Sequence, residues 1–186
     1  MAISKTTGFT LIELMTVITV LAIMLFLALP NFNVWLQNTQ IRTAGEALLN
    51  GLQLARTEAV RRNVNVELRL DLVGGVVSSS WTAWVPGTGE VIQARLAAEG
   101  SSAAFVAITP AGARTVTFNS FGTIAANSDG TNPIGEIKID SAALAAADSR
   151  KLCIMVGTGG TVRMCDPQVA STDTRSCGAA IPAGCL

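Results

Sequence analysis

The chain opens with a long apolar segment. From Leu14 to Gln40 it carries no charged side chain over 27 residues, and the most strongly apolar stretch ends at Pro30. An α-helix rises about 1.5 Å per residue, so Phe9 to Leu29 reaches about 30 Å, the thickness of the hydrocarbon core of a bilayer. The pattern predicts a membrane-spanning helix. It differs from a secretory signal, because the apolar run is longer than the usual h-region and no A-x-A-like site follows it.

A second helical pattern follows the apolar segment. Up to about Arg62, apolar side chains recur at spacings of three and four, which predicts a stripe that packs against a sheet. The stripe consists of Ile41, Ala44, Leu48, Leu52, Ala55 and Ala59. Glu58 and Arg62 stand four positions apart, so an ion pair on the exposed side of the helix is expected.

The period of the pattern then changes from that of a helix to that of a strand. Between Val64 and Leu72 apolar residues alternate strictly with polar ones, as in an antiparallel strand with one buried face, and Gly74-Gly75 ends the run. Further short strands are predicted at 80–85, 91–96, 115–119, 136–140, 151–156 and 161–165, separated by glycine-rich turns. These elements predict an α+β fold, in which a long N-terminal helix packs on one antiparallel sheet or on two small ones.

The last two predicted strands form a hairpin that turns at Gly157-Thr158-Gly159-Gly160. All four cysteines lie in the last third of the chain, at Cys153, Cys165, Cys177 and Cys185. An even number of cysteines in an exported region predicts two disulfides. The hairpin places the first two opposite each other, which favours the pairs 153–165 and 177–185, although the sequence leaves all three connectivities open. Their spacings are too wide for a zinc ribbon, so no metal is expected.

Composition narrows the class of protein. Apolar residues make up 49 % of the chain and charged residues 14 %, and the mean hydropathy of +0.46 favours a membrane-facing part. The formal net charge is zero, so the whole chain shows no electrostatic footprint for nucleic acid. Histidine is absent, which excludes catalytic triads and metal sites that need imidazole. We therefore expect no enzyme activity and no cofactor.

Two residues do not suit a plain membrane anchor. Glu13 stands at the head of the apolar run, where an unpaired carboxylate in lipid costs about 2.5–3.5 kcal/mol. Pro30 removes a backbone hydrogen bond and kinks a helix that continues past it. Taken separately, each has an ordinary explanation, since Glu13 can reach the headgroups and Pro30 can mark a helix end.

The segment Gly8–Glu13, with the sequence GFTLIE, resembles the processing site of type IV pilins and type II secretion pseudopilins. The resemblance implies that the membrane prepilin peptidase cuts between Gly8 and Phe9 and that the new amino group of Phe9 is methylated. Glu13 then takes the acidic position of the family, and Pro30 falls where many pilins carry a helix kink. Because a buried ion needs a partner, Glu13 is expected to pair with the terminal ammonium of a neighbouring subunit in a filament.

This resemblance implies how the chain is divided and where it resides. Residues 1–8 are expected to form the leader, 9–40 the transmembrane and filament-core segment of the helix, and 41–186 a periplasmic head with the pilin fold. Lys5 favours a cytoplasmic leader by the positive-inside bias, which places the cysteines in an oxidising compartment. The expected location is a single pass through the inner membrane, followed by a pilus on the cell surface.

Three further stretches resemble the GspH/FimT family of minor pilins and pseudopilins. They are residues 54–63, residues 116–123 and the closing hairpin 151–165. The resemblance implies a low-abundance subunit that takes part in priming pilus assembly at or near the tip. Its partners would be other minor pilins and the major pilin. The H-type minor pseudopilin of type II secretion is an alternative, because its N-terminal chemistry is the same.

A second alternative is DNA binding in natural transformation. FimT-like members carry an arginine-rich GRxR motif in the closing hairpin, whereas the corresponding stretch here reads Gly160-Thr161-Val162-Arg163. Threonine in place of the first arginine removes a phosphate contact. A local patch of Arg163, Arg150 and Lys151 remains as a candidate DNA contact, although an ordinary solvated hairpin is the favoured interpretation.

Overall fold

The structure is a computed structural model that describes residues 8–178 and 181–185, with only the helical backbone described for residues 27–31. It comprises two compact units, Met1–Leu36 and Gln37–Leu186, and helix α1, Leu11–Arg62, belongs in part to each. The predicted leader, including Lys5, lies outside the described residues except for Gly8. Its role stays a prediction.

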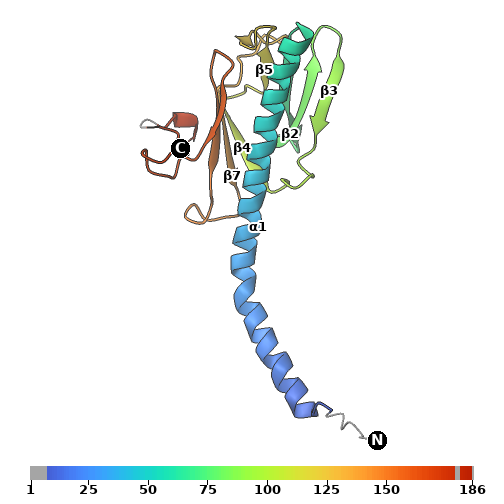
Figure 1. Ribbon diagram of the computed structural model, residues 1–186, viewed down its shortest axis with the longest axis vertical. Coiled ribbons are helices and arrows are strands. Elements are labelled where there is room, and N and C mark those ends of the chain that lie inside the picture. The colour runs from blue at the N-terminus through green and yellow to red at the C-terminus, as the bar shows by residue number, and fades with distance from the viewer. Residues whose placement is uncertain (1–7, 179–180, 186) are drawn as a thin grey trace, which may run out of the picture. The chain divides into compact units, whose positions relative to one another are not determined.

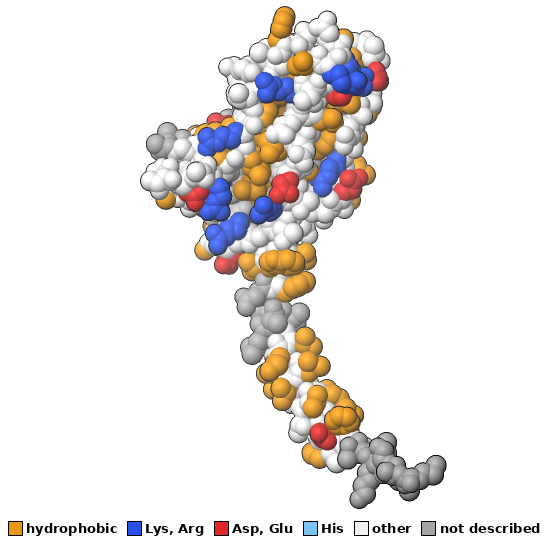
Figure 2. All heavy atoms as spheres, in the orientation of Figure 1, with side chains coloured by type: hydrophobic (Ala, Val, Ile, Leu, Met, Phe, Trp, Pro, Cys, Tyr) orange, Lys and Arg blue, Asp and Glu red, His pale blue; other side chains and the backbone are white. Residues whose placement is uncertain are grey.

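In the first unit α1 exposes its apolar side chains. Every large hydrophobic residue from Leu11 to Phe26 is more than half exposed, and Figure 2 shows hydrophobic side chains along this stretch. Among the described residues, no helical stretch is both long and apolar enough to cross a membrane. The span predicted for Phe9 to Leu29 includes residues 27–29, whose side chains lie outside the described residues, and it stays a prediction. The helical backbone continues through Pro30, and the kink predicted there is likewise untested.

Helix α1 ends at Arg62, the residue at which the pattern predicts its end. The next residue, Asn63, adopts the left-handed conformation with φ 54°. Its N–H donates to the carbonyl of Val60 at 3.4 Å, and the N–H of Val64 donates to the carbonyl of Ala59 at 3.3 Å. These two bonds form a Schellman motif, which satisfies carbonyls that the helix itself leaves without a partner.

The second unit is built from two antiparallel sheets against the second half of α1 (Figure 1). The five-stranded sheet has the order β3-β2-β1-β5-β6, and the four-stranded sheet has the order β4-β7-β8-β9. The strands are β1 Val66–Val73, β2 Val76–Val85, β3 Glu90–Arg95, β4 Ala104–Thr109, β5 Thr115–Phe118, β6 Ile124–Ala125, β7 Glu136–Ser141, β8 Leu152–Val156 and β9 Val162–Cys165, and a 3-10 turn, η1, covers Ala183–Cys185.

The predicted stripe of α1 forms the centre of the core. Ile41, Ala44, Leu48, Leu52, Ala55 and Ala59 are all fully buried. Two glycines let the helix approach both sheets: a Cβ at Gly45 would lie 3.1 Å from a methyl carbon of Leu152 in β8, and one at Gly51 would lie 2.7 Å from the indole of Trp81 in β2. The helix therefore packs on both sheets and holds them in one core, and the predicted α+β fold is confirmed.

The strand predictions hold with three differences. β2 begins at Val76, directly after Gly74-Gly75, because both glycines have positive φ and form a two-residue hairpin turn that pairs Val73 with Val76. β4 was not predicted, since its sequence AFVAIT is an apolar run without alternation. The two-residue strand β6 is too short to leave any periodic signal.

The alternation predicts one buried face for β1, and Glu67 is also buried although it lies on the opposite, polar face. The side chain is 1 % exposed. Its Oε1 accepts hydrogen bonds from the N–H of Ser128 at 2.6 Å and from the hydroxyl of Thr117 at 3.0 Å, and its Oε2 accepts one from the hydroxyl of Ser128 at 2.9 Å. The loop after β6 covers this part of the sheet, so Glu67 is buried against donors from residues far along the sequence.

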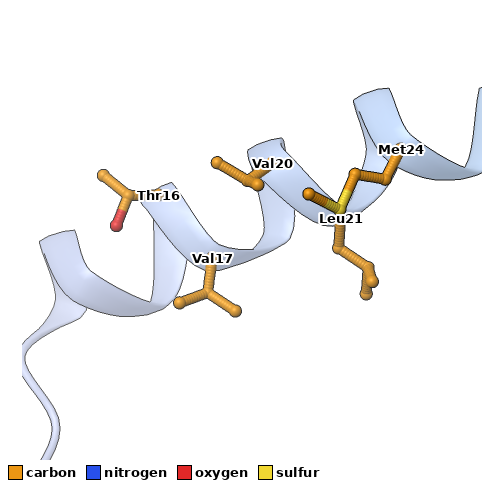
Figure 3. A pocket seen from close by; sticks show the side chains of 5 residues that line it. All are labelled: Thr16, Val17, Val20, Leu21 and Met24. Atoms are coloured by element: carbon orange, nitrogen blue, oxygen red, sulfur yellow. The ribbon is translucent and has the colours of Figure 1, made fainter.

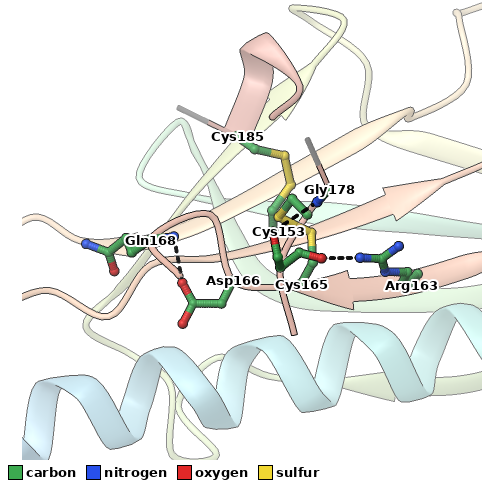
Figure 4. The surroundings of a disulfide bond; sticks show 9 residues. Cys153, Arg163, Cys165, Asp166, Gln168, Gly178 and Cys185 are labelled. Atoms are coloured by element: carbon green, nitrogen blue, oxygen red, sulfur yellow. Dashed lines mark hydrogen bonds between the residues drawn. A yellow bond between two sulfur atoms is a disulfide. The ribbon is translucent and has the colours of Figure 1, made fainter. Parts of the chain in front are cut away.

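The disulfide connectivity also differs from the favoured prediction. Cys153 and Cys165 do face each other across β8 and β9, as the hairpin predicts. The bonds, however, join Cys153 to Cys185, with Cα atoms 5.6 Å apart, and Cys165 to Cys177, with Cα atoms 4.9 Å apart (Figure 4). All four form one buried cluster.

The course of the C-terminal segment explains these pairs. The N–H of Asp166 donates to the carbonyl of Arg175 at 2.8 Å, which folds the segment back beside β9 and brings Cys177 to Cys165. Further on, the N–H of Gly184 donates to a carboxylate oxygen of Glu136 in β7 at 3.0 Å. This contact holds η1 against the sheet, so that Cys185, the last residue of η1, reaches Cys153 in the neighbouring strand β8.

Candidate functional site

The predicted cleavage site lies just before α1. Gly8, Phe9 and Thr10 belong to no regular element, and α1 begins at Leu11. Phe9 is 83 % exposed, and a Cβ at Gly8 would meet no atom within 4 Å. The Gly8–Phe9 peptide bond therefore lies outside the helix, and the described residues leave it accessible, as a bond that a peptidase attacks must be.

Glu13 lies in the first turn of α1. A carboxylate in the first turn interacts favourably with the positive end of the helix dipole. Among the described residues no ion pair joins Glu13 to a basic side chain. The pairing expected with a neighbouring subunit is compatible with this environment and is not tested by it.

The next two turns of α1 carry an open apolar strip (Figure 3). Thr16, Val17, Val20, Leu21 and Met24 line it, and their spacing of one, three, one and three residues puts them on one face of the helix. Residues of one helix alone form this surface. An uncovered apolar surface of this kind is typical of a helix that packs against lipid or against other chains.

Three amide side chains fix the start of the head unit on α1. The side chain of Asn38 donates to the carbonyl of Asp148 at 2.9 Å and accepts from the N–H of Arg150 at 2.8 Å. The side-chain oxygen of Gln40 accepts from the N–H of Ala103 at 2.9 Å. The side-chain oxygen of Gln37, the first residue of the unit, accepts from the hydroxyl of Ser141 at the end of β7. Two separate loops, one after β7 and one before β4, are thus tied to a single turn of the helix.

The candidate DNA contacts do not form a cluster of free cations. The guanidinium of Arg163 donates to the carbonyl of Ser176 in the folded-back segment (Figure 4). The ammonium of Lys151 lies 3.7 Å from the carboxylate of Asp140. Arg150 is exposed. Two of the three basic side chains are therefore directed to acceptors of their own chain, which weakens the case for a phosphate-binding patch.

Sequence reasoning missed a contact between two distant turns. The carbonyl of Gly122, in the turn between β5 and β6, accepts a hydrogen bond from the guanidinium of Arg56 on α1 at 3.0 Å. The N–H of Ile124 donates to the carbonyl of Thr158, in the β8–β9 turn, at 3.1 Å. A Cβ at Gly160 would overlap the carbonyl oxygen of Gly122. The only sequence signal was glycine at both turns, which does not reveal that they meet.

Among the described residues, no group of three histidine, cysteine or acidic side chains is placed to hold a metal ion. The described head instead carries scattered pairs of opposite charge. Glu58 accepts from both Arg61 and Arg62 at 2.6–2.7 Å. These hydrogen bonds lower the pKa of Glu58 from 4.5 to about 2. The ion pair predicted between Glu58 and Arg62 is thus confirmed.

Two family models match the chain. The model of the type II transport protein GspH matches residues 44–160, and that of the prokaryotic N-terminal methylation motif matches residues 3–29. No protein of curated function matches it.

Among solved structures, two crystal forms of the type IV minor pilin FimU from Pseudomonas aeruginosa match. One is 20% identical and covers 69% of this chain and 92% of FimU, with a TM-score of 0.48. The other is 19% identical and covers 68% and 97%, with a TM-score of 0.47.

The GspH model covers more than half of the chain, from the buried stripe of α1 through both sheets to the turn before β9. The methylation motif covers the exposed apolar half of the same helix and the open bond before it. The chain therefore belongs to the GspH family, the minor pilins and pseudopilins of type IV pili and type II secretion.

Proposed function

We propose that this protein is a minor type IV pilin that takes part in priming pilus assembly and sits at or near the pilus tip. It is made as a prepilin, cut between Gly8 and Phe9 by the prepilin peptidase, and methylated on the amino group of Phe9. Before assembly, segment 9–40 holds it in the inner membrane with the head, 41–186, in the periplasm. It acts as a structural subunit, and its partners are other minor pilins and the major pilin.

One observation carries this proposal: the first half of α1 has an apolar surface that its own chain does not cover. From Leu11 to Phe26 each large hydrophobic side chain keeps more than half of its surface exposed. Burying the exposed surface of each such side chain contributes about 1 kcal/mol. A helix of this kind is stable only in lipid or among other apolar helices, and a pilin occupies both environments in turn.

Glu13 supplies a reason for the move from one environment to the other. In the bilayer its carboxylate has no counter-ion among the described residues, whereas in a filament the methylated ammonium of a neighbouring Phe9 provides one. Pairing offsets the cost of burying the charge, and so favours incorporation. Glu13→Ala should therefore reduce the fraction of protein found in filaments. An unchanged fraction would show the pairing hypothesis to be wrong.

The H-type pseudopilin of type II secretion remains the second candidate, and the match to the GspH model supports it equally. Both candidates require the same processing of the N-terminus, so the chemistry of Phe9 does not separate them. The location of the mature protein does. A minor pilin co-purifies with sheared surface filaments, while a pseudopilin stays with the cell envelope and its loss blocks secretion.

DNA binding is supported more weakly, because Arg163 and Lys151 already face acceptors of their own chain. An unpaired cluster would have provided several phosphate contacts and a marked dependence of affinity on salt.

The decisive experiment is intact-mass analysis of the protein from sheared filaments and from membranes, with and without reductant. The expected filament species begins at N-methyl-Phe9 and is four hydrogen atoms lighter than its reduced form, because it holds two disulfides. Finding only protein that begins at Met1, in cells with active prepilin peptidase, would overturn the proposal and leave a simple anchored domain.

A further inference from the structure

We propose that Thr10 is a positioning residue for prepilin cleavage: it caps the N-terminus of α1 and thereby keeps the Gly8–Phe9 bond out of the helix. This inference rests on the proposed function, since it concerns the bond that the peptidase cuts. It assigns a role to a side chain inside the processing motif that is separated from the scissile bond by one residue.

The hydrogen bonds of Thr10 are those of a helix N-cap. Its hydroxyl oxygen accepts from the N–H of Glu13 at 3.3 Å, and its carbonyl accepts the first bond of the helix from the N–H of Leu14 at 3.2 Å. The sequence from Thr10 to Glu13 has the T-x-x-E spacing of a capping box. The cap thus satisfies a backbone donor that would otherwise have no partner, and α1 begins at Leu11.

The position of this cap matters because of what one more helical turn would do. Without an acceptor on residue 10, the free N–H groups of the first turn are best satisfied in an apolar environment by lengthening the helix. The N–H of Ile12 would then bond the carbonyl of Gly8, since helical bonds join residue i to residue i−4. That carbonyl belongs to the scissile bond. A longer helix would therefore keep the peptidase from reaching this bond.

In cleavage, water adds to the carbonyl carbon of Gly8 and the C–N bond to Phe9 breaks. A carboxylate is left on Gly8, and the amine of Phe9 takes up a proton. The attacking groups must reach the carbonyl carbon, and in a helix the neighbouring turns cover it. In the structure Phe9 is 83 % exposed, and none of the described residues has an atom within 4 Å of a Cβ at Gly8. Among the described residues, the Thr10 cap is what sets the helix start.

The test compares variants at residue 10 that separate capping from shape. Thr10→Val keeps the shape of threonine and loses the acceptor, whereas Thr10→Asn changes the shape and is as good a cap. Thr16→Val is the matched control, because the Thr16 hydroxyl donates to the carbonyl of Glu13 at 2.9 Å in the same helix and caps nothing. Full-length prepilins in vesicles are incubated with purified prepilin peptidase, and the rate of cleavage is followed by mass spectrometry.

We expect Thr10→Val to be cut about fivefold more slowly, the factor that corresponds to loss of a typical N-cap. Thr10→Asn and Thr16→Val should be cut at close to the wild-type rate. Equal rates for Thr10→Val and wild type would overturn the inference alone. A Thr10→Asn variant that is cut as slowly as Thr10→Val would do the same, because the peptidase would then be recognising the Thr10 side chain directly. A wild-type chain that is not cut at all would overturn the proposed function together with this inference.

Discussion

The contact between the turns at Gly160 and Gly122 leads to a sharp prediction for Gly160→Ala. Gly160 has φ +78°, a conformation that alanine adopts only with strain. The added Cβ would also overlap the carbonyl oxygen of Gly122, which is backbone and has no rotamer that lets it move aside. Both effects act on the same residue, so the substitution is expected to be far more harmful than its size suggests.

The magnitude follows from two contributions. Placing alanine in the left-handed region costs about 1–2 kcal/mol. Relief of the overlap requires the turns to separate, which costs about 1–3 kcal/mol as overpacking and weakens the hydrogen bond from Ile124 to Thr158. We expect Gly160→Ala to lower the free energy of unfolding by about 2–5 kcal/mol.

Two other glycines separate these contributions. Gly130 has φ +72° and open space around its Cβ position, so Gly130→Ala should cost only the conformational part, about 1–2 kcal/mol. Gly159, beside the test residue, has open space and no positive φ, so Gly159→Ala should be nearly neutral. The assay is urea unfolding of the full chain in detergent, followed by tryptophan emission. If Gly160→Ala cost no more than Gly130→Ala, the argument from backbone overlap would be refuted.

Three further predictions concern the disulfides, an ion pair and the helix end. Cys185→Ser should free the thiol of Cys153 and leave the other disulfide intact; peptide mapping without reductant checks this, and a free Cys177 would contradict the connectivity. Glu58→Gln should cost about 1 kcal/mol near pH 7. Because the pKa of Glu58 is lowered from 4.5 to about 2, its stabilisation is present above pH 4.5 and lost as the pH falls to 2, so urea unfolding should show the variant and wild type converging there. Asn63→Gly should raise the free energy of unfolding by about 0.5–1 kcal/mol, since glycine adopts positive φ without strain; a lower midpoint in urea would argue against this.

Features set by neighbouring residues were readable from the sequence. The spacing of Ile41 to Ala59 identified the buried stripe of α1, and the switch from a period of 3.6 to a period of 2 located the end of the helix at Arg62. The closing hairpin was found in the correct register, because its turn and its strands are adjacent in the chain. The processing motif was found for the same reason, since all of its residues lie within six positions.

Features set by distant segments were not readable. The alternation in β1 indicates which side of the sheet Glu67 occupies, but not that a loop some 60 residues later covers that side. Strand β4 pairs with β7, about 30 residues away, and its unbroken apolar run could equally have been part of a helix. The disulfides depended on how the C-terminal segment folds back, which the spacing of the cysteines does not encode.

The disulfide pairs bear on how the protein withstands proteolysis. The loop from Asp166 to Ser176 includes Arg175, an exposed residue after which trypsin-like enzymes cut. The peptide on the C-terminal side of such a cut would begin at Ser176 and contain Cys177 and Cys185, which are bonded to strands β9 and β8. Both ends of that peptide therefore stay attached to the sheet. A nicked subunit would keep its C-terminus and gain only the mass of one water molecule until it met a reductant.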